Sequence, residues 1–489
     1  MDDLDFGTRT LAFQPGDVRH QVLYRHLRDR ILSGYLRATQ KLPPTRVLAR
    51  DLGLARGTVA LAYEQLKAEG YAEARVGAGT FVADVQLQRP VVTARAKPLV
   101  PSQQPALALR AAKARPGQAD VQGASLVPFR AGTAPLDLLP RTALARIAAR
   151  IMRTSPMDVW GYGPAQGEPQ LREVLAAYLR ASRGLYVEAD RVIITSGTQQ
   201  ALWLMAHVLA DPGETVWMED PGYWGAVEAF ERAGLTLTSV PVDGDGLCVD
   251  EALRRAPTAR LAYVTPTHQF PLGATLSLAR RLALLRWAEA TGGWIIEDDY
   301  DGAFCYRGAP LEPLYALDTA ARVLYVGSLS KVLAPAFRIG YIVAPPDLVQ
   351  PLVEARTAMD RHAPAWMQRT VAAFIEEGHF GRHVRRLRKT GWDRQQAMLA
   401  AGTAHLSDVV KLVPSDTGLH LVGFATDPSA DDAAMSAAAQ SAGLCVKPLS
   451  MYYRQVPARR GWVFGYAPFA PADLAWAAQR LGKLWSAVP

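Results

Sequence analysis

The sequence is poor in cysteine and has no long apolar run. Its 489 residues include three cysteines, Cys248, Cys305 and Cys445, and none of them forms a Cys-x-x-Cys pair. A disulfide framework and a zinc site are therefore excluded, and we expect no metal. No run approaches the roughly 18 apolar residues of a membrane-spanning helix, and the acidic start, residues 1–5, is unlike a signal peptide. These absences predict a cytoplasmic protein without a membrane partner.

Acidic residues are also missing from one stretch of the chain. Residues 85–119 hold six Lys/Arg and no Asp/Glu, and residues 18–82 hold 11 Lys/Arg against five Asp/Glu. Residues 120–489 are balanced, with 36 of each. The positive charge is thus concentrated near the N-terminus, which predicts contact with a polyanion, and nucleic acid is the first candidate.

The N-terminal residues predict a small helical domain with a hairpin. Apolar residues recur at helical spacing in three segments, and Thr45 is placed to cap the second helix. Two later segments alternate about a glycine-rich turn, as the strands of a hairpin do. The expected helices cover residues 20–33, 45–53 and 56–69, and the expected strands cover residues 71–75 and 80–83.

A change in composition after this domain predicts a linker. Residues 85–125 are rich in Pro, Ala, Gln and Arg. The positive charge of this linker either helps to hold DNA or only keeps a spacer in solution, and the sequence favours neither. We expect a DNA-binding domain over residues 1–84 and a larger domain over residues 126–489.

The larger domain predicts an α/β fold with a mostly parallel sheet. Short apolar runs alternate with helical segments, as in sheets that are covered on both faces and gather ligands at the carboxyl ends of their strands. The last residues predict a small α/β cap with strands near 419–424 and 463–466. Five of the apolar runs end in polar loops, namely residues 196–200, 220–223, 265–271, 298–300 and 328–331.

These loops carry the groups that a pyridine-aldehyde phosphate requires. Lys331 supplies an amine for a Schiff base, and Asp298 is placed to keep the pyridine nitrogen protonated. Tyr300 is placed to donate to the phenolic oxygen of the ring, and Tyr223 to stack on the ring. A strand-to-helix turn, hydroxyls and a guanidinium would cradle the phosphate. The expected cradle consists of Gly197, Thr198, Ser328, Ser330 and Arg338. We therefore expect pyridoxal 5′-phosphate as the cofactor.

The motifs also occur in the order of a known family. Residues 126–489 resemble a fold-type-I aminotransferase domain, and residues 18–84 resemble the GntR-type winged helix-turn-helix. Together they resemble the MocR/GabR family of bacterial transcription regulators. The matching phrases in the larger domain are Gly161-Tyr162-Gly163, Thr195-Ser196-Gly197, Glu219-Asp220-Pro221-Gly222-Tyr223, His268-Gln269-Phe270-Pro271, Glu297-Asp298-Asp299-Tyr300-Asp301, Ser330-Lys331 and Pro448-Leu449-Ser450-x-Tyr452-Tyr453.

The resemblance implies roles for individual residues of the larger domain. Lys331 would form the internal aldimine, and Asp298 would pair with the pyridine nitrogen. Tyr300 would contact the phenolic oxygen, and Tyr223 would stack on the ring. Tyr162 would reach the cofactor phosphate of a neighbouring subunit, which implies a homodimer.

The resemblance also implies contacts with double-stranded DNA. It rests on Leu42-Pro43-Pro44-Thr45-Arg46-x-Leu48-Ala49, Arg56-Gly57-Thr58-Val59-x-x-Ala62-Tyr63 and Gly77-Ala78-Gly79-Thr80-Phe81-Val82. Arg46, Arg56 and Thr58 would contact bases and phosphates, and the wing from Arg75 to Gly77 would lie near the minor groove. A dimer would favour a promoter with repeated half-sites. Ala55 and Gly57 stand where relatives often carry hydroxyl residues, so some phosphate contacts are expected to be missing.

Three functions compete for this domain combination. We favour a regulator that senses an amino compound, or pyridoxal phosphate itself, through aldimine chemistry at Lys331. The alternative is a competent aminotransferase that carries a DNA-binding domain, and a cofactor-free scaffold is disfavoured because Lys331 has its full set of partners. Phe270 replaces the asparagine of ordinary aminotransferases, and residues 461–465 lack the arginine that clamps a substrate carboxylate. We therefore expect weak half-transamination without efficient turnover. Arg454, Arg459 or Arg460 could substitute from nearby loops, but a surface role is favoured for each of them.

Overall fold

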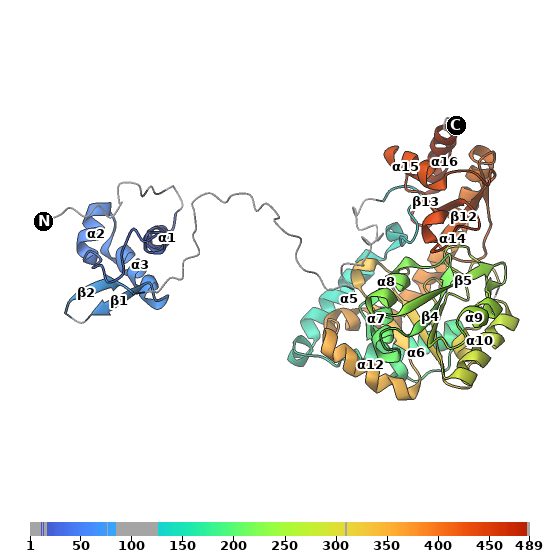
Figure 1. The fold of residues 1–489 in the computed structure, drawn as a ribbon, viewed down its shortest axis with the longest axis horizontal. Helices are drawn as coiled ribbons and strands as arrows, with labels where there is room; N and C mark the ends of the chain where they lie inside the picture. The colour runs from blue at the N-terminus through green and yellow to red at the C-terminus, as the bar shows by residue number, and fades with distance from the viewer. Residues whose placement is uncertain are drawn as a thin grey trace. The chain divides into compact units, whose positions relative to one another are not determined.

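The computed structural model describes residues 11, 13, 17–75, 77–84, 126–308 and 311–486. The chain divides into two compact units, residues 1–106 and 107–489 (Figure 1). The expected linker over residues 85–125 lies outside the described residues, so the domain boundaries stay predictions. Among the residues described, no helix combines the length and the apolar character needed to cross a membrane.

The described residues of the first unit form three helices and a two-stranded antiparallel sheet. They are α1 (Arg19–Leu32), α2 (Thr45–Leu52), α3 (Arg56–Ala68), β1 (Ala72–Arg75) and β2 (Gly79–Val82). Leu27, Val59 and Leu66 are almost fully buried and join the helices in one core. The prediction that Thr45 caps α2 is wrong, because Pro44 has an extended backbone and takes the cap position. Thr45 is instead the first helical residue.

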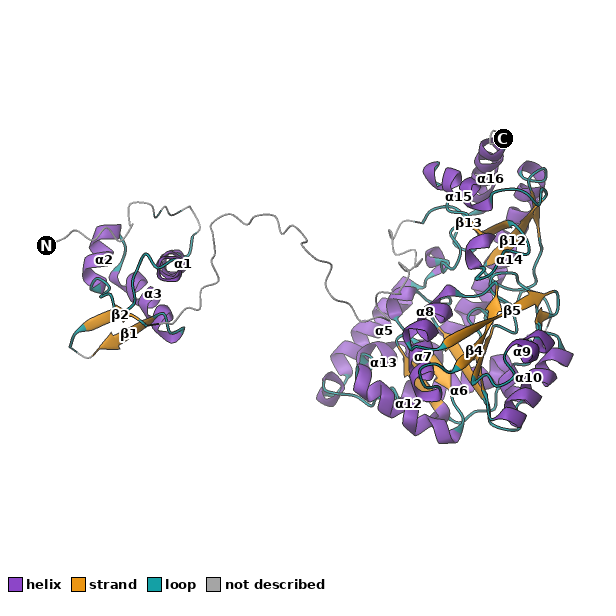
Figure 2. Ribbon diagram, viewed as in Figure 1, coloured by secondary structure: helices purple, strands orange, loops and turns teal. Residues whose placement is uncertain are grey.

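The second unit is built on an eight-stranded sheet (Figure 2). Strands β9, β8, β7, β4 and β5 run parallel, whereas β10 is antiparallel to both β3 and β9, and β6 is antiparallel to β5. The mostly parallel sheet is thus confirmed. In spatial order the strands are β3 (Val192–Thr195), β10 (Gly340–Val343), β9 (Val323–Ser328), β8 (Trp294–Asp298), β7 (Leu261–Val264), β4 (Thr215–Asp220), β5 (Thr236–Asp243) and β6 (Gly246–Leu247).

Helices cover both faces of this sheet. Alternate residues of each strand point to opposite faces, and both sets of side chains are buried under helices. Ile193 and Leu324 pack with α7 (Thr198–Leu209), α8 (Trp224–Arg232) and α12 (Pro346–Met359). Their neighbours Val192 and Tyr325 belong to the core on the opposite face. The helices of that face are α6 (Pro169–Arg183), α13 (Ala365–Glu376), α9 (Val249–Arg255) and α10 (Leu278–Thr291). The short α11 (Leu314–Leu317) and α5 (Arg141–Thr154) complete this part of the described chain.

The C-terminal residues form the expected α/β cap. Its antiparallel sheet has the order β11 (Val410–Leu412), β12 (His420–Ala425), β14 (Gly461–Gly465) and β13 (Lys447–Pro448). The helices α14 (His379–His405), α15 (Asp432–Ser441) and α16 (Pro471–Trp485) pack with this sheet. The two predicted cap strands are confirmed, with bounds shifted by one or two residues.

Candidate functional site

Lys331 lies in the loop that follows β9, at the carboxyl edge of the large sheet. The backbone N–H of Ser330 donates to Ser328 Oγ at 3.1 Å, which fixes the turn before the lysine. The Lys331 amine donates to the backbone oxygen of Gly132. Burial lowers the pKa of this amine, and the charges of Asp301 and Asp298 oppose the shift. A lysine with a lowered pKa is more often neutral, and the neutral amine is the nucleophile.

Asp298 ends β8 and has one carboxylate oxygen left without a partner. The residue is 3% exposed, and its Oδ2 accepts a hydrogen bond from the hydroxyl of Tyr263 at 2.8 Å. Its Oδ1 is buried and has no hydrogen-bond partner in the structure. Burial raises the pKa of Asp298 to about 7. A buried acceptor without a donor is costly, and a protonated pyridine nitrogen is a donor of the required kind. The carboxylate therefore fits the expected cofactor.

The expected phosphate cradle comes together where β10 lies between β3 and β9. Gly340 pairs with the last residue of β3 on one side and with Ser328 on the other. Gly197 precedes α7, which begins at Thr198, and has a φ of 98°. A Cβ atom at Gly197 would lie 3.5 Å from Arg338 Nη1. A helix N-terminus and a guanidinium are therefore side by side, as a dianionic phosphate requires.

Aromatic rings surround the space beside Asp298. Tyr223 follows β4 and meets Phe270 edge to face, with ring centroids 5.9 Å apart. Phe270 also contacts Tyr300 at 5.9 Å and Tyr452 at 5.2 Å. Burial, followed by the charge of Asp298, raises the pKa of Tyr223 to about 12, which places its ring near that carboxylate. Position 270 thus offers a ring without a hydrogen-bond donor.

A histidine and a second aspartate accompany Tyr300. His268 Nδ1 lies 3.0 Å from the Tyr300 hydroxyl and 2.7 Å from Asp301 Oδ2. Both residues stand within the phrases that match the family, but no role was predicted for either. Tyr263, which donates to Asp298, and Gly132, which accepts from Lys331, were not predicted from the sequence. A tyrosine inside an apolar strand is a weak signal for the first, and the second acts through a backbone oxygen that every residue has.

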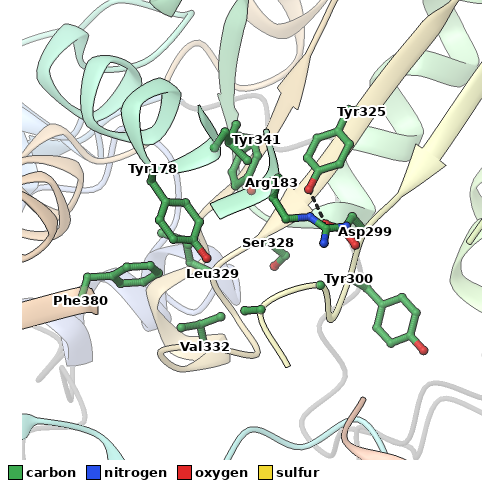
Figure 3. Close-up of a pocket in the computed structure, with 13 residues that line it drawn as sticks. Tyr178, Arg183, Asp299, Tyr300, Tyr325, Ser328, Leu329, Val332, Tyr341 and Phe380 are labelled. Carbon is green, nitrogen blue, oxygen red and sulfur yellow. Dashed lines mark hydrogen bonds and ion pairs between the residues drawn. The ribbon is translucent and has the colours of Figure 1, made fainter. Parts of the chain in front are cut away.

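A small cavity with a mixed polar and apolar lining lies next to the loop that carries Lys331 (Figure 3). Arg183, the last residue of α6, forms an ion pair with Asp299, with Nε 3.0 Å from Oδ2 and both side chains 4% exposed. Tyr325 donates its hydroxyl to Asp299, and Arg183 Nη2 donates to Thr267 Oγ1 at 3.3 Å. Tyr300 points away from this ion pair. The pair therefore anchors the backbone between the two residues expected to contact the cofactor ring.

Tyr162 is separate from these contacts within one chain. Its side chain is 84% exposed. It meets His362 edge to face, with centroids 6.0 Å apart, and the Arg361 guanidinium lies 5.2 Å from its ring centroid. Its contact with the phosphate of a second subunit stays a prediction.

Two of the three arginines considered as carboxylate clamps contact acidic side chains of this chain. Arg454 lies 3.5 Å from Glu231, and Arg460 lies 3.3 Å from Asp432. The guanidinium of Arg459 instead stacks on a ring, 3.3 Å from the centroid of Phe424. The structure therefore shows no free clamp on β14, whose described residues are all buried and include no arginine.

The residues expected to contact DNA lie at the ends of elements in the first unit. Arg46 is in the first turn of α2 and Arg56 begins α3, and both are exposed, whereas Thr58 is half-buried. Arg75 ends β1 and donates to Glu73 at 2.6 Å. Its guanidinium lies over the ring of Phe81. Gly77 occupies the hairpin turn with a φ of 73°. The turn therefore adopts a backbone conformation that favours glycine.

Comparisons with known proteins match both units. Residues 125–460 match the family "Aminotransferase class I and II", and residues 19–82 match "Bacterial regulatory proteins, gntR family". The "Probable rhizopine catabolism regulatory protein MocR" of Rhizobium meliloti is 38% identical over 455 residues, which cover 93% of this chain and 91% of that protein.

Two further matches represent the two kinds of relative. The "HTH-type pyridoxine biosynthesis transcriptional regulator PdxR" of Corynebacterium glutamicum is 32% identical over 93% of both chains. The crystal structure of LysN, an alpha-aminoadipate aminotransferase of Thermus thermophilus complexed with N-(5'-phosphopyridoxyl)-L-leucine, superposes with a TM-score of 0.68. It is 28% identical and covers 74% of this chain and 92% of its own.

Proposed function

The chain belongs to the MocR-type family of transcriptional regulators, which join a GntR helix-turn-helix domain to an aminotransferase class I and II domain, and we propose that an amino compound at Lys331 changes its binding to promoter DNA. The cofactor of the larger domain is pyridoxal 5′-phosphate. Residues 1–84 would bind DNA, and residues 126–489 would sense the ligand and form a homodimer.

One observation carries the proposal. Asp298 Oδ1 is buried without a hydrogen-bond partner, and the charge of Asp298 acts on the Lys331 amine. The same chain exposes Arg56 at the start of the third helix of its first unit. When bound, the cofactor supplies an aldehyde for which a free amine competes with Lys331. Asp298 would hold a proton on the ring nitrogen, Tyr223 would cover the ring, and Arg338 with the N-terminus of α7 would hold the phosphate.

Ligand binding can shift the protein between two states only if the ligand binds them with different affinities. Displacement of Lys331 from the cofactor by a free amine would leave the lysine with a free amine, which can donate to the Gly132 oxygen and interact with the charges of Asp298 and Asp301. That is a local change of charge and hydrogen bonding at a buried site, which is the kind of event that biases a conformational equilibrium. The candidate ligands are an amino acid, a γ-amino or sulfonated amine, and pyridoxal phosphate itself.

A competent aminotransferase is the second candidate, and Lys331, Asp298 and Tyr300 support it. Two observations favour sensing. Phe270 gives no donor for the phenolic oxygen of the cofactor, and no arginine lies on β14 to clamp a substrate carboxylate.

We expect a panel of amines to change the visible spectrum of the cofactor-loaded protein and, for the true ligand, its affinity for operator DNA. With an excess of a second keto acid present to accept the amino group, keto-acid formation from the amine should still stop at about one equivalent per site, as half-transamination without turnover requires. The measurement is keto acid released against time, alongside DNA binding in the same samples. Sustained release over many turnovers would establish the enzyme and reject the sensor.

Arg56→Ala is expected to weaken operator binding by about 10- to 100-fold, because a base contact from an arginine is worth ~1–3 kcal/mol. Binding is measured by fluorescence anisotropy at several salt concentrations, since phosphate contacts make affinity salt-dependent. Arg25→Ala is the matched control, because Arg25 is an exposed arginine on α1 of the same unit. Equal effects of the two substitutions would reject α3 as the recognition helix.

A further inference from the structure

His268, Asp301 and Tyr300 form a buried polar cluster beside the Lys331 site. His268 lies in the loop after β7, and the other two residues follow β8. The His268 and Asp301 side chains are each 2% exposed. The Asp301 carboxylate also acts on the Lys331 amine, whose pKa it raises against the effect of burial. The cluster therefore borders the lysine, although neither family resemblance nor local pattern assigns His268 and Asp301 a task.

The hydrogen-bond geometry fixes how the cluster shares its protons. A neutral imidazole carries a hydrogen on one ring nitrogen, and an ionised carboxylate only accepts. Because Asp301 Oδ2 lies 2.7 Å from His268 Nδ1, the hydrogen belongs on Nδ1 and points to Asp301. The Tyr300 oxygen lies 3.0 Å from the same nitrogen, so it accepts the Nδ1–H together with Asp301 and keeps its own hydrogen to donate elsewhere. Burial, followed by the charge of Asp301, raises the pKa of Tyr300, so the phenol keeps its proton.

The cap holds the imidazole in this orientation from its other side. Gly418 has a φ of 92°, and a Cβ atom there would lie 2.3 Å from His268 Cε1. Ser415 Oγ lies 3.5 Å from His268 Nε2, and the His420 ring centroid is 5.3 Å away. Burial lowers the pKa of His420 to about 4, so this second histidine stays neutral near pH 7. The imidazole therefore has no room to turn away from Tyr300.

Because Phe270 has no hydrogen-bond donor, the Tyr300 hydroxyl is the donor expected to reach the phenolic oxygen of the cofactor. The Phe270 ring lies 5.9 Å from that of Tyr300 and has no donor, where ordinary aminotransferases place an asparagine amide. Tyr300 is then the one expected donor to the phenolic oxygen of the cofactor. Its hydroxyl must be held in position, because the position of a donor decides how well it stabilises charge on the acceptor.

We propose that His268 and Asp301 are positioning residues that hold the Tyr300 hydroxyl against the phenolic oxygen of the cofactor. The inference rests on the proposed function, since it requires the cofactor at Lys331. The groups that face His268 are Asp301, Tyr300, Ser415 and His420.

The test is a pH titration of the visible absorbance of the cofactor-loaded, full-length protein. A donor on the phenolic oxygen stabilises the form that has one proton fewer, so loss of the donor moves the midpoint to higher pH. His268→Leu is expected to raise the midpoint by about 1–2 pH units, the value of a hydrogen bond to a charged group. His268→Asn has an amide that can replace the Nδ1–H, so its midpoint should lie close to that of the wild-type protein. His405→Gln is the control, because His405 is an exposed histidine at the end of α14 and takes no part in the cluster.

A double-mutant cycle decides whether His268 acts through Tyr300. In a Tyr300→Phe background, His268→Leu should cause no further shift of the midpoint. Additive shifts, or an unchanged midpoint in the single variant, would overturn the inference. If His268→Leu does not fold, Asp301→Asn takes its place, and a wild-type midpoint in that variant has the same meaning. A wild-type protein that develops no visible band would instead reject the proposed function itself.

Discussion

Lys331→Ala is expected to abolish the absorbance band of the covalently bound cofactor and, in protein freed of unbound cofactor, the response of DNA binding to amines. The amine of Lys331 is the group that can bond covalently to the cofactor aldehyde, and alanine has no nucleophile. The phosphate cradle and Asp298 are unchanged in this variant, so weak, non-covalent cofactor binding should remain. Absorbance is measured after dialysis with pyridoxal phosphate, and operator affinity is measured with and without amine.

Lys411→Ala is the control for this experiment, because Lys411 is an exposed lysine on β11. Thermal unfolding of both variants shows whether either loses its fold. Because the Lys331 amine is tied to the Gly132 oxygen, a modest change in stability is expected for Lys331→Ala. An amine response that survives in Lys331→Ala freed of cofactor would place the sensing site elsewhere in the chain.

Much of the candidate site could be predicted because parallel strands end at one edge of a sheet. Asp298 ends β8 and Lys331 follows β9, and these two strands pair directly, so the proximity of the two residues follows from the alternation of strands and helices. Tyr223 follows β4, two strands from β8 across β7. The roles of these residues toward the cofactor stay predictions, but their placement needed only local patterns.

The unpredicted parts depend on contacts between distant segments. The orientation of His268 is set by the Gly418 loop, far along the chain, and no local pattern announces that contact. The backbone oxygen of Gly132 has no sequence signature at all. The wrong cap at Thr45 has a different cause, because Ser/Thr preference at helix starts competes with the extended geometry that Pro44 imposes.

Arg183→Met is expected to lower the free energy of unfolding of the larger unit by about 3–5 kcal/mol, the usual cost of leaving one buried charge without its partner. The pair is deeply buried, and burial already raises the pKa of Asp299 against the effect of Arg183. Urea unfolding followed by tryptophan fluorescence measures the effect selectively, because all 11 tryptophans lie at residue 160 or later. Arg150→Met is the matched control, since Arg150 pairs with Glu377 at the surface and should cost less than about 1 kcal/mol.

The same substitution should also weaken the hold on the cofactor, because Asp299 lies between Asp298 and Tyr300 in the chain (Figure 3). Replacing both partners, in Arg183→Met/Asp299→Leu, removes the unpaired charge and should recover most of the lost stability. It should not recover cofactor affinity, since the anchor of the backbone is still missing. A double variant that regains both would mean that the ion pair matters only for stability. A double variant that regains stability but not cofactor affinity would show that the Arg183–Asp299 pair positions Asp298, the carboxylate expected to contact the cofactor.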